Sequence, residues 1–345
     1  MAYMKALVKV SPEHAEIRQV PIPSCGPEEV LVRVRSAALC GTDLHILEWN
    51  RWAQTAGIKL PFVVGHECCG DIVALGEGVR GLAVGDKIAV ETHVPCGTCY
   101  QCLTGEQHIC NNLVIFGVHM NGCFAEYTVV PAICARKIPM AIDYDPGSMM
   151  EPIGTAFRAV LESEVGGASV LVMGCGPIGL FAVAAADILG ASLIIASDIS
   201  PARLEIARTL GANQMINPQQ GGLVAAVQTL TNGYGVDVII EASGNAKALA
   251  GSFTLLRKGG KVALVGLPGQ PVELEIGRDI VFKEAKVIGI HGRKMFSTWS
   301  QIERLMTTGK LDIGAVMTHS FPLEEWQEGV RLAKSGEACK VILHP

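Results

Sequence analysis

A glycine-rich turn between an apolar strand and a helix constrains the fold of this 345-residue chain more than any other segment. After the apolar run Ser169–Met173, and at the start of the helical pattern Gly179–Leu189, the sequence reads Gly174-Cys175-Gly176-Pro177-Ile178-Gly179. The first glycine of such a turn permits a tight bend, the second lets the backbone approach a pyrophosphate, and the third lets helix and strand pack closely. The turn therefore predicts a strand–turn–helix unit whose helix N-terminus binds dinucleotide phosphates.

Strands and helices alternate along the chain after this turn. The expected strands are Ser169–Met173, Leu193–Ser197, Gln214–Ile216, Val236–Glu241 and Lys261–Val265. The expected helices are Gly179–Leu189, Ser200–Leu210, Gly222–Leu230 and Ala246–Leu256. Alternation of this kind predicts a parallel, doubly wound sheet, the Rossmann arrangement of an α/β fold.

An acidic residue follows the second of these strands. Asp198 lies at the position where a carboxylate binds the ribose hydroxyls of NAD and would repel the 2′-phosphate of NADP. Ile199 and Ser200 place no cation beside it, so the sequence favours NAD. A role for Asp198 as the cap of the helix ahead of Pro201 remains an alternative. The further residues expected at the cofactor site are Arg203, Ser243, Gly266 and Leu267.

The chain before Glu151 has a β-rich pattern. Ala6–Val10 and Val30–Ser36 are alternating or β-branched, and closely spaced glycines between residues 63 and 88 indicate short strands with tight turns, as in a small barrel. The chain is longer than one hydrophobic core usually serves. We therefore expect a β-rich domain of residues 1–152 and 297–345, and a dinucleotide-binding domain of residues 153–296.

Four cysteines form a closely spaced group in the β-rich part. Their spacing is C-x2-C-x2-C-x7-C, and they are Cys96, Cys99, Cys102 and Cys110. Four thiolates can close a tetrahedral shell around Zn²⁺ and leave no position open to substrate, so we expect a structural zinc. An iron–sulfur cluster with related spacing, or four unligated cysteines, are the alternatives.

A second set of metal-ligand residues is spread along the sequence. Cys40 follows the strand Val30–Ser36, His66 follows an expected strand at 62–64, and Glu151 opens a helix. Each residue alone would most simply be structural. Together, a thiolate, an imidazole and a carboxylate make a three-ligand zinc site with a fourth position for water or substrate.

These segments, taken in order, resemble the zinc-containing medium-chain dehydrogenase/reductase superfamily over essentially the whole chain. Within it the sequence most resembles the L-threonine 3-dehydrogenases, and the supporting stretches are 42–46, 48–50, 64–67, 122–127 and 292–299. The resemblance implies a GroES-like catalytic domain beside the Rossmann domain, one catalytic and one structural zinc per chain, NAD as cofactor, and a homotetramer.

The resemblance also implies roles for individual residues at the catalytic zinc. Cys40, His66 and Glu151 look like its ligands. Glu67 looks like the neighbouring carboxylate that can move onto the metal when substrate is absent. The implied reaction is transfer of a hydride from a secondary alcohol to NAD, with L-threonine giving 2-amino-3-ketobutyrate.

Two further groups of roles follow from the same resemblance. Thr42 and His45 look like members of a proton relay from the substrate hydroxyl, and a plain surface position is the alternative for His45. The residues expected to contact substrate are His93, Thr155 and Arg293.

One segment departs from the threonine dehydrogenases. They read G-N-A where this chain has Gly154-Thr155-Ala156, and Arg158 is also unlike them. A polyol, vicinal-diol or hydroxy-acid dehydrogenase is therefore the alternative function. A non-catalytic zinc- and nucleotide-binding protein is a third hypothesis, and the open-sided metal site argues against it.

The composition excludes several other classes. The net charge is −5 without a Lys/Arg run, so we expect no nucleic-acid or membrane partner, only a small-molecule substrate. No stretch has the roughly 20 apolar residues of a membrane span, and residues 1–5 do not begin a signal-peptide pattern. We expect a cytoplasmic protein, in which the 12 cysteines indicate metal binding more than disulfides.

Overall fold

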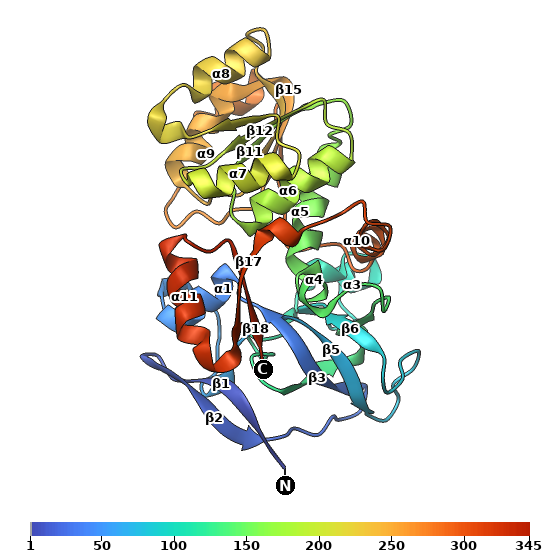
Figure 1. Cartoon of the computed structure of the whole chain (residues 1–345). Helices are drawn as coiled ribbons and strands as arrows, with labels where there is room; N and C mark the ends of the chain where they lie inside the picture. Colours follow the sequence, from blue (N-terminus) through green and yellow to red (C-terminus); the bar gives the residue numbers. More distant parts are fainter. Residues whose placement is uncertain (1) are drawn as a thin grey trace. The chain divides into compact units, whose positions relative to one another are not determined.

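The computed structural model describes residues 2–345 and divides them into two compact units (Figure 1). The first unit contains the chain up to Glu151 together with Met317–Pro345, and the second contains Pro152–Val316. The sequence placed residues 297–316 with the first unit, whereas the structure places them with the second. Helix α10 (Ser297–Thr307) begins this stretch, and its buried Trp299 packs beside the guanidinium of Arg293, which belongs to the second unit.

The first unit is built on one antiparallel sheet, one larger mixed sheet and a two-stranded antiparallel pair formed by residues 93–94 and 114–115. One sheet has the order β2-β1-β4, and the other has the order β10-β6-β5-β3-β18-β17 with β9 also paired to β3. The bounds are β1 Tyr3–Ser11, β2 His14–Pro21, β3 Glu29–Ala38, β4 Phe62–Val63, β5 Glu67–Leu75, β6 Lys87–Val90, β9 Tyr127–Pro131, β10 Ala135–Lys137, β17 Met317–Pro322 and β18 Lys340–His344. Strands β17 and β18 pair in parallel, and the other strand pairs described in these two sheets are antiparallel.

The core of the first unit lies between these strands and helix α11 (Trp326–Ser335), which packs on β17 and β18 (Figure 1). Alternate residues of β3, among them Val30, Val32 and Val34, are buried while their neighbours are more exposed. This alternation is what a half-buried antiparallel strand requires, and it confirms the β-rich expectation for this part of the chain.

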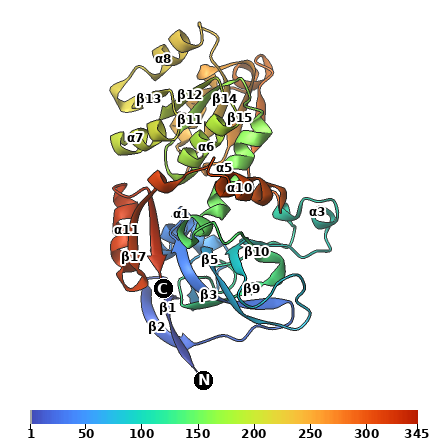
Figure 2. The ribbon, with the colours of Figure 1, turned by 45° about the vertical axis from the view of Figure 1, so that its right-hand side comes forward.

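The second unit carries one parallel sheet of order β13-β12-β11-β14-β15-β16. Strands β13, β12, β11, β14 and β15 follow one another across the unit in Figure 2. The bounds are β11 Ser169–Met173, β12 Leu193–Ser197, β13 Gln214–Ile216, β14 Val236–Glu241, β15 Leu256–Leu264 and β16 Lys286–Gly289. The helices between them are α6 Pro177–Ile188, α7 Pro201–Thr209, α8 Leu223–Leu230 and α9 Ala246–Ser252.

This sheet confirms the predicted α/β class, with one shifted and one unforeseen strand. The strand expected at Lys261–Val265 begins at Leu256, because the helix before it ends at Ser252 and the buried Leu255 and Leu256 turn the chain into the sheet. The pair Gly259-Gly260, expected to end a helix, lies inside this strand. Strand β16 was not expected, since its four residues are mostly exposed and show no apolar alternation.

The order of the strands marks where a ligand would bind. The chain runs from β11 outward through β12 and β13, and then returns to the other side of β11 as β14. In open parallel sheets the crevice at the carboxyl ends of the strands on either side of this reversal is the usual ligand site.

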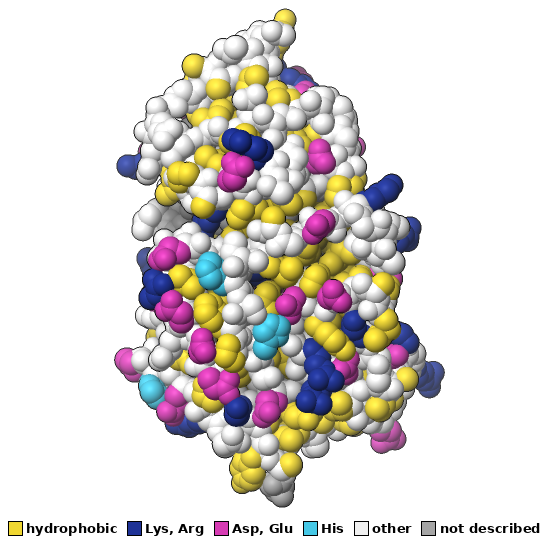
Figure 3. Space-filling model, in the orientation of Figure 1, with side chains coloured by type: hydrophobic (Ala, Val, Ile, Leu, Met, Phe, Trp, Pro, Cys, Tyr) yellow, Lys and Arg dark blue, Asp and Glu magenta, His cyan; other side chains and the backbone are white. Residues whose placement is uncertain are grey.

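Within residues 2–345 no helix combines the length and apolarity needed to cross a membrane. Acidic and basic side chains are interspersed on the face shown in Figure 3.

Candidate active site and cofactor pocket

The pairing of two strands brings the first group of candidate ligands together. Strand β3 ends at Ala38, two residues before Cys40, and β5 begins at Glu67, directly after His66. Ala38 and Glu67 are register partners in the antiparallel ladder. The end of one strand and the start of the other therefore place Cys40 beside His66 and Glu67.

These three side chains form a compact set of metal donors. A sulfur of Cys40, a ring nitrogen of His66 and a carboxylate oxygen of Glu67 all lie within 4.8 Å of one another. His66 is 6% exposed and Glu67 is 0% exposed. A half-buried thiolate with a buried imidazole and a buried carboxylate has the donor chemistry that Zn²⁺ takes, so the residues present fit this metal.

Asp43 orients the imidazole of this set. Cys40 caps helix α1 (Gly41–Glu48), and Oδ2 of Asp43 accepts a hydrogen bond from the Cys40 backbone N–H at 2.9 Å. The other oxygen, Oδ1, lies 3.0 Å from Nδ1 of His66. Burial disfavours the charged imidazole, but the charges of Asp43 and Cys40 raise the pKa of His66 well above its ordinary value. A carboxylate on one ring nitrogen leaves the other nitrogen to face a metal.

Lys340 forms a buried ion pair with Glu67. Strand β18 pairs with the end of β3, which carries Lys340 to this position from the far end of the chain. Burial, with a further contribution from Glu151, raises the pKa of Glu67, while Lys340 and His66 act in the opposite direction. Burial opposes the charge of Lys340, but Glu67 and Cys40 raise its pKa. Sequence reasoning gave no role to Lys340 or Asp43; for Asp43 the capping-box spacing from Cys40 was an available signal.

Glu151 lies outside the compact set of donors. Its Oε1 accepts a hydrogen bond from Oγ1 of Thr92 at 3.1 Å, and its charge acts on Glu67. The structure therefore groups Glu67, and not Glu151, with Cys40 and His66. His93 follows Thr92 and is buried, with its backbone N–H donating to Oε1 of Glu91 at 2.9 Å.

The two residues of the expected relay lie on helix α1. Thr42 is half-buried in the first turn. His45 is exposed, and its Nδ1 lies 2.9 Å from Nδ2 of Asn50.

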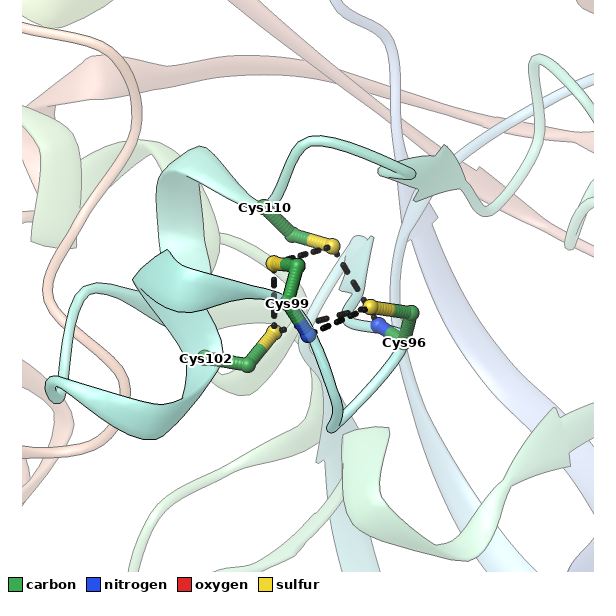
Figure 4. A group of neighbouring side chains, drawn as sticks. All are labelled: Cys96, Cys99, Cys102 and Cys110. Atoms are coloured by element: carbon green, nitrogen blue, oxygen red, sulfur yellow. Dashed lines mark hydrogen bonds between the residues drawn. The ribbon is translucent and has the colours of Figure 1, made fainter.

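The four cysteines of the second group converge in space, as Figure 4 shows. Their sulfur atoms all lie within 4.8 Å of one another, and none of the four is in a disulfide. Hydrogen bonds from Thr98 and from the Cys99 backbone N–H lower the pKa of Cys96 to about 5. Burial raises the pKa of Cys102 to about 12. Backbone donors already face part of this sulfur set, as expected of thiolates around a metal.

A cavity of about 530 Å³ lies in the second unit at the carboxyl ends of its strands. Among the residues that line it are five of the expected cofactor residues, namely Gly174, Gly176, Asp198, Arg203 and Ser243. The other expected residues do not line this cavity: Pro177, Ile178 and Gly179 begin helix α6, while Gly266 and Leu267 follow strand β15.

Asp198 joins the glycine turn to the next helix. Its Oδ2 accepts a hydrogen bond from the Cys175 N–H at 2.6 Å, and its Oδ1 accepts one from the Ser200 N–H at 2.8 Å. The capping residue of α7 is Ser200, whose side chain accepts from the Arg203 N–H. Asp198 is therefore not the helix cap that the sequence left open.

Arg293 is fully buried in the second unit, with its guanidinium 6.0 Å from the ring centroid of Trp299. It packs on helix α5 (Met150–Ser163), where a Cβ on Gly154 would lie 2.9 Å from Cδ of Arg293. Arg158, one turn further along α5, donates from Nη1 to the backbone oxygen of His291 at 3.0 Å. Arg158, one of the two positions at which this segment departs from the threonine dehydrogenases, thus binds the stretch of chain that contains Arg293.

Comparisons with known proteins cover the whole chain. Residues 26–140 match the family model of the alcohol dehydrogenase GroES-like domain, and residues 177–308 match that of the zinc-binding dehydrogenases. An L-threonine 3-dehydrogenase of Bacillus subtilis (strain 168) is 43% identical over 343 residues, which are 99% of each chain. A solved structure from Sinorhizobium meliloti 1021 bound to NADP is 32% identical with a TM-score of 0.91. An alcohol dehydrogenase from E. coli CFT073 complexed with NADH is 31% identical with a TM-score of 0.92. Both structural alignments cover 100% of each chain.

Proposed function

The chain belongs to the zinc-binding dehydrogenases, an NAD(P)-dependent family of oxidoreductases, and from this premise we propose that it is an L-threonine 3-dehydrogenase. The proposed reaction oxidises the C3 hydroxyl of L-threonine with NAD and gives 2-amino-3-ketobutyrate and NADH. The observation that carries the proposal is the compact set of Cys40, His66 and Glu67 donors within 4.8 Å, in a chain 43% identical to a threonine dehydrogenase over nearly its full length.

The proposed zinc ligands are Cys40, His66 and a carboxylate, either Glu67 or Glu151. When bound, zinc polarises the substrate hydroxyl as a Lewis acid, and NAD accepts the hydride from the carbon. The protein's own part is to hold the ligands in place. Asp43 supports this role, because it fixes the ring of His66 through Nδ1.

Lys340 balances the charge of the site. Its ammonium pairs with Glu67 inside the protein, where an unpaired carboxylate would be costly to bury. We propose that Glu67 would either pair with Lys340 or bind the metal, and that Glu151, which accepts a hydrogen bond from Thr92, would provide the second carboxylate.

The proton of the substrate hydroxyl leaves through side chains of helix α1. We propose that Oγ1 of Thr42 accepts this proton while releasing its own hydroxyl proton outward, and that His45, which is exposed and bonded to Asn50, passes a proton to solvent. Thr42 and His45 are three residues apart on one helix and therefore lie on the same side of neighbouring turns, which suits a relay from a half-buried to an exposed position.

The four-cysteine set is proposed to hold a second, structural zinc. Four sulfurs that close on one point leave no open coordination position, so this site fits a metal that shapes the loop and takes no part in the reaction.

NAD is the proposed cofactor because Asp198 lines the cavity of the second unit. A carboxylate there accepts hydrogen bonds from ribose hydroxyls and repels a 2′-phosphate. Two cations, Arg203 and Lys247, line the same cavity. The ratio of kcat/KM for NAD to kcat/KM for NADP tests whether the carboxylate of Asp198 or these cations determine the choice of cofactor. We expect the ratio to favour NAD.

The substrate carries an ammonium and a carboxylate beside the reacting hydroxyl. We propose that whichever of Glu67 and Glu151 does not bind the metal pairs with the ammonium, that Arg293 pairs with the carboxylate, and that His93 lines the substrate pocket. Thr155 and Arg158 favour a second candidate, a polyol or vicinal-diol dehydrogenase, because Thr155 stands where threonine dehydrogenases carry asparagine and Arg158 binds the segment that contains Arg293.

The test is a substrate panel with purified protein, NAD, and L-threonine, sorbitol, 2,3-butanediol or short hydroxy acids, followed by NADH absorbance. Turnover of L-threonine above all others is expected. Turnover of a polyol or diol without threonine would favour the second candidate, and zinc-loaded protein that turns over none of these would contradict both. Light scattering tests the expected homotetramer.

A further inference from the structure

Glu241 is a buried carboxylate at the carboxyl edge of the parallel sheet, and the reaction proposed above does not use it. It ends strand β14 and is 0% exposed. Its register partners are Met173, which ends β11, and Leu264, which ends β15. Glu241 therefore lies at the strand reversal, where open parallel sheets bind their ligands.

One oxygen of this carboxylate holds a turn that lines the cofactor cavity. Oε1 accepts hydrogen bonds from both the backbone N–H and the hydroxyl of Ser243. The same hydroxyl accepts from the Asn245 N–H at 3.1 Å, and Ser243 and Asn245 both line the cavity. Glu241 itself is beneath this wall and does not line it.

The turn that Glu241 holds is in close contact with the glycine turn. A Cβ on Gly174 would lie 2.7 Å from the backbone nitrogen of Ser243. A shift of Ser243 by a few tenths of an ångström therefore moves one wall of the dinucleotide site against the other.

The second oxygen of Glu241 has no hydrogen-bond partner among residues 2–345. It faces Gly266, where a Cβ would lie 2.7 Å from Oε2. A buried carboxylate with one unsatisfied oxygen lowers the stability of the folded state, and a neutral side chain of the same shape would be better tolerated. The stability of the sheet therefore does not account for a charged group at this position.

We propose that Glu241 is a positioning residue for the dinucleotide, which it serves by fixing Ser243 against the glycine turn. This inference rests on the proposed cofactor function of the second unit. The group that acts on the cofactor site is Ser243, and the carboxylate provides the strong acceptor that its N–H and hydroxyl share. An amide in place of the carboxylate is a weaker acceptor and presents a donor on its other side.

The test is the dissociation constant of NADH, measured by fluorescence for the full chain and for Glu241→Gln. The variant is expected to bind NADH about tenfold or more weakly, as a lost charged hydrogen bond implies. Its thermal midpoint without cofactor is expected to be equal to or above that of the wild type. KM for NAD should rise, while kcat at saturating NAD changes little. The matched control is Glu205→Gln, the same chemical change at an exposed position of α7, and it should alter none of these values.

Ser243→Ala supplies the second arm. If Glu241 acts through Ser243, this variant also weakens NADH binding, and the double variant is no weaker than the weaker single variant. Unchanged NADH affinity in Glu241→Gln, or additive losses in the double variant, would overturn the inference while the cofactor function stands. A wild-type protein that binds neither NADH nor NADPH would overturn the proposed function and this inference with it.

Discussion

Replacing Asp43 by asparagine keeps the shape of the side chain but removes its ability to serve two donors. In the protein, Oδ2 accepts from the Cys40 N–H and Oδ1 faces Nδ1 of His66. An asparagine has one acceptor oxygen and one NH2 group. If the oxygen faces Cys40, the NH2 group faces His66 and requires Nδ1 to be the acceptor. The ring proton then moves to Nε2, the nitrogen that a metal needs unprotonated.

The expected loss of zinc affinity can be estimated from other metal sites in which a carboxylate accepts a hydrogen bond from a metal-binding histidine. Losing one weakens metal affinity by about 10- to 100-fold, or about 1.4–2.7 kcal/mol. The assay is competition for zinc between the protein and a chromophoric chelator at fixed pH. The Asp145→Asn variant is the control, because that side chain is partly exposed and belongs to the same unit. A zinc affinity of Asp43→Asn within twofold of the wild type would refute the reasoning, since His66 would then need no carboxylate to present its nitrogen.

Three further predictions concern an ion pair and a glycine in the second unit and the four-cysteine set in the first unit. Burial opposes the charge of Asp237, but hydrogen bonds from Ser169 and pairing with Arg257 lower its pKa below the ordinary value of 3.8. Asp237→Asn should therefore lose about 1–2 kcal/mol at neutral pH. Because a lowered pKa stabilises the fold above the ordinary value, the difference from wild type should shrink as pH falls below about 4, and thermal melts from about pH 3 to 7 will show whether it does. Gly154→Ala places a methyl group 2.9 Å from Cδ of Arg293, so it should lower the free energy of unfolding by about 1–3 kcal/mol and raise KM for the alcohol more than KM for NAD. Stability and kinetics equal to those of the wild type would show that the Arg293 side chain moves aside without cost. Cys102→Ser should remove one zinc per chain and lower the thermal midpoint while leaving NADH affinity unchanged, and metal analysis that finds no zinc lost would contradict the four-sulfur site.

The parts of the fold that the sequence predicted are those set by local patterns. The glycine turn at 174–179 and the strands around it could be assigned because turn, strand and helix are contiguous in the chain. The cysteine set could be assigned for the same reason, since its four members lie within 15 residues, 96–110. Strand β16 and the early start of β15 could not, because both depend on pairing with strands that the local pattern does not specify.

The compact set of metal donors was predictable in its residue types and not in its supporting contacts. Cys40 and His66 stand in recognisable segments, and the structure brings them together. Lys340 contacts Glu67 because β18 pairs with β3, although the two residues are separated by most of the chain. No spacing in the sequence predicts this ion pair. The position of Glu151 beside Thr92, outside the compact donor set, likewise follows from tertiary packing.

The central claim is that an open-sided zinc, held by Cys40, His66 and a carboxylate, carries the oxidation of L-threonine. The most direct measurement is zinc content together with the L-threonine-dependent rate of NADH formation, for the wild type and His66→Ala. We predict two zinc ions per chain in the wild type and one in the variant. The rate should fall by about a thousandfold, the several kcal/mol that a Lewis acid supplies, with NADH affinity retained. A variant that keeps both zinc ions, or that oxidises L-threonine at the wild-type rate, would contradict the account.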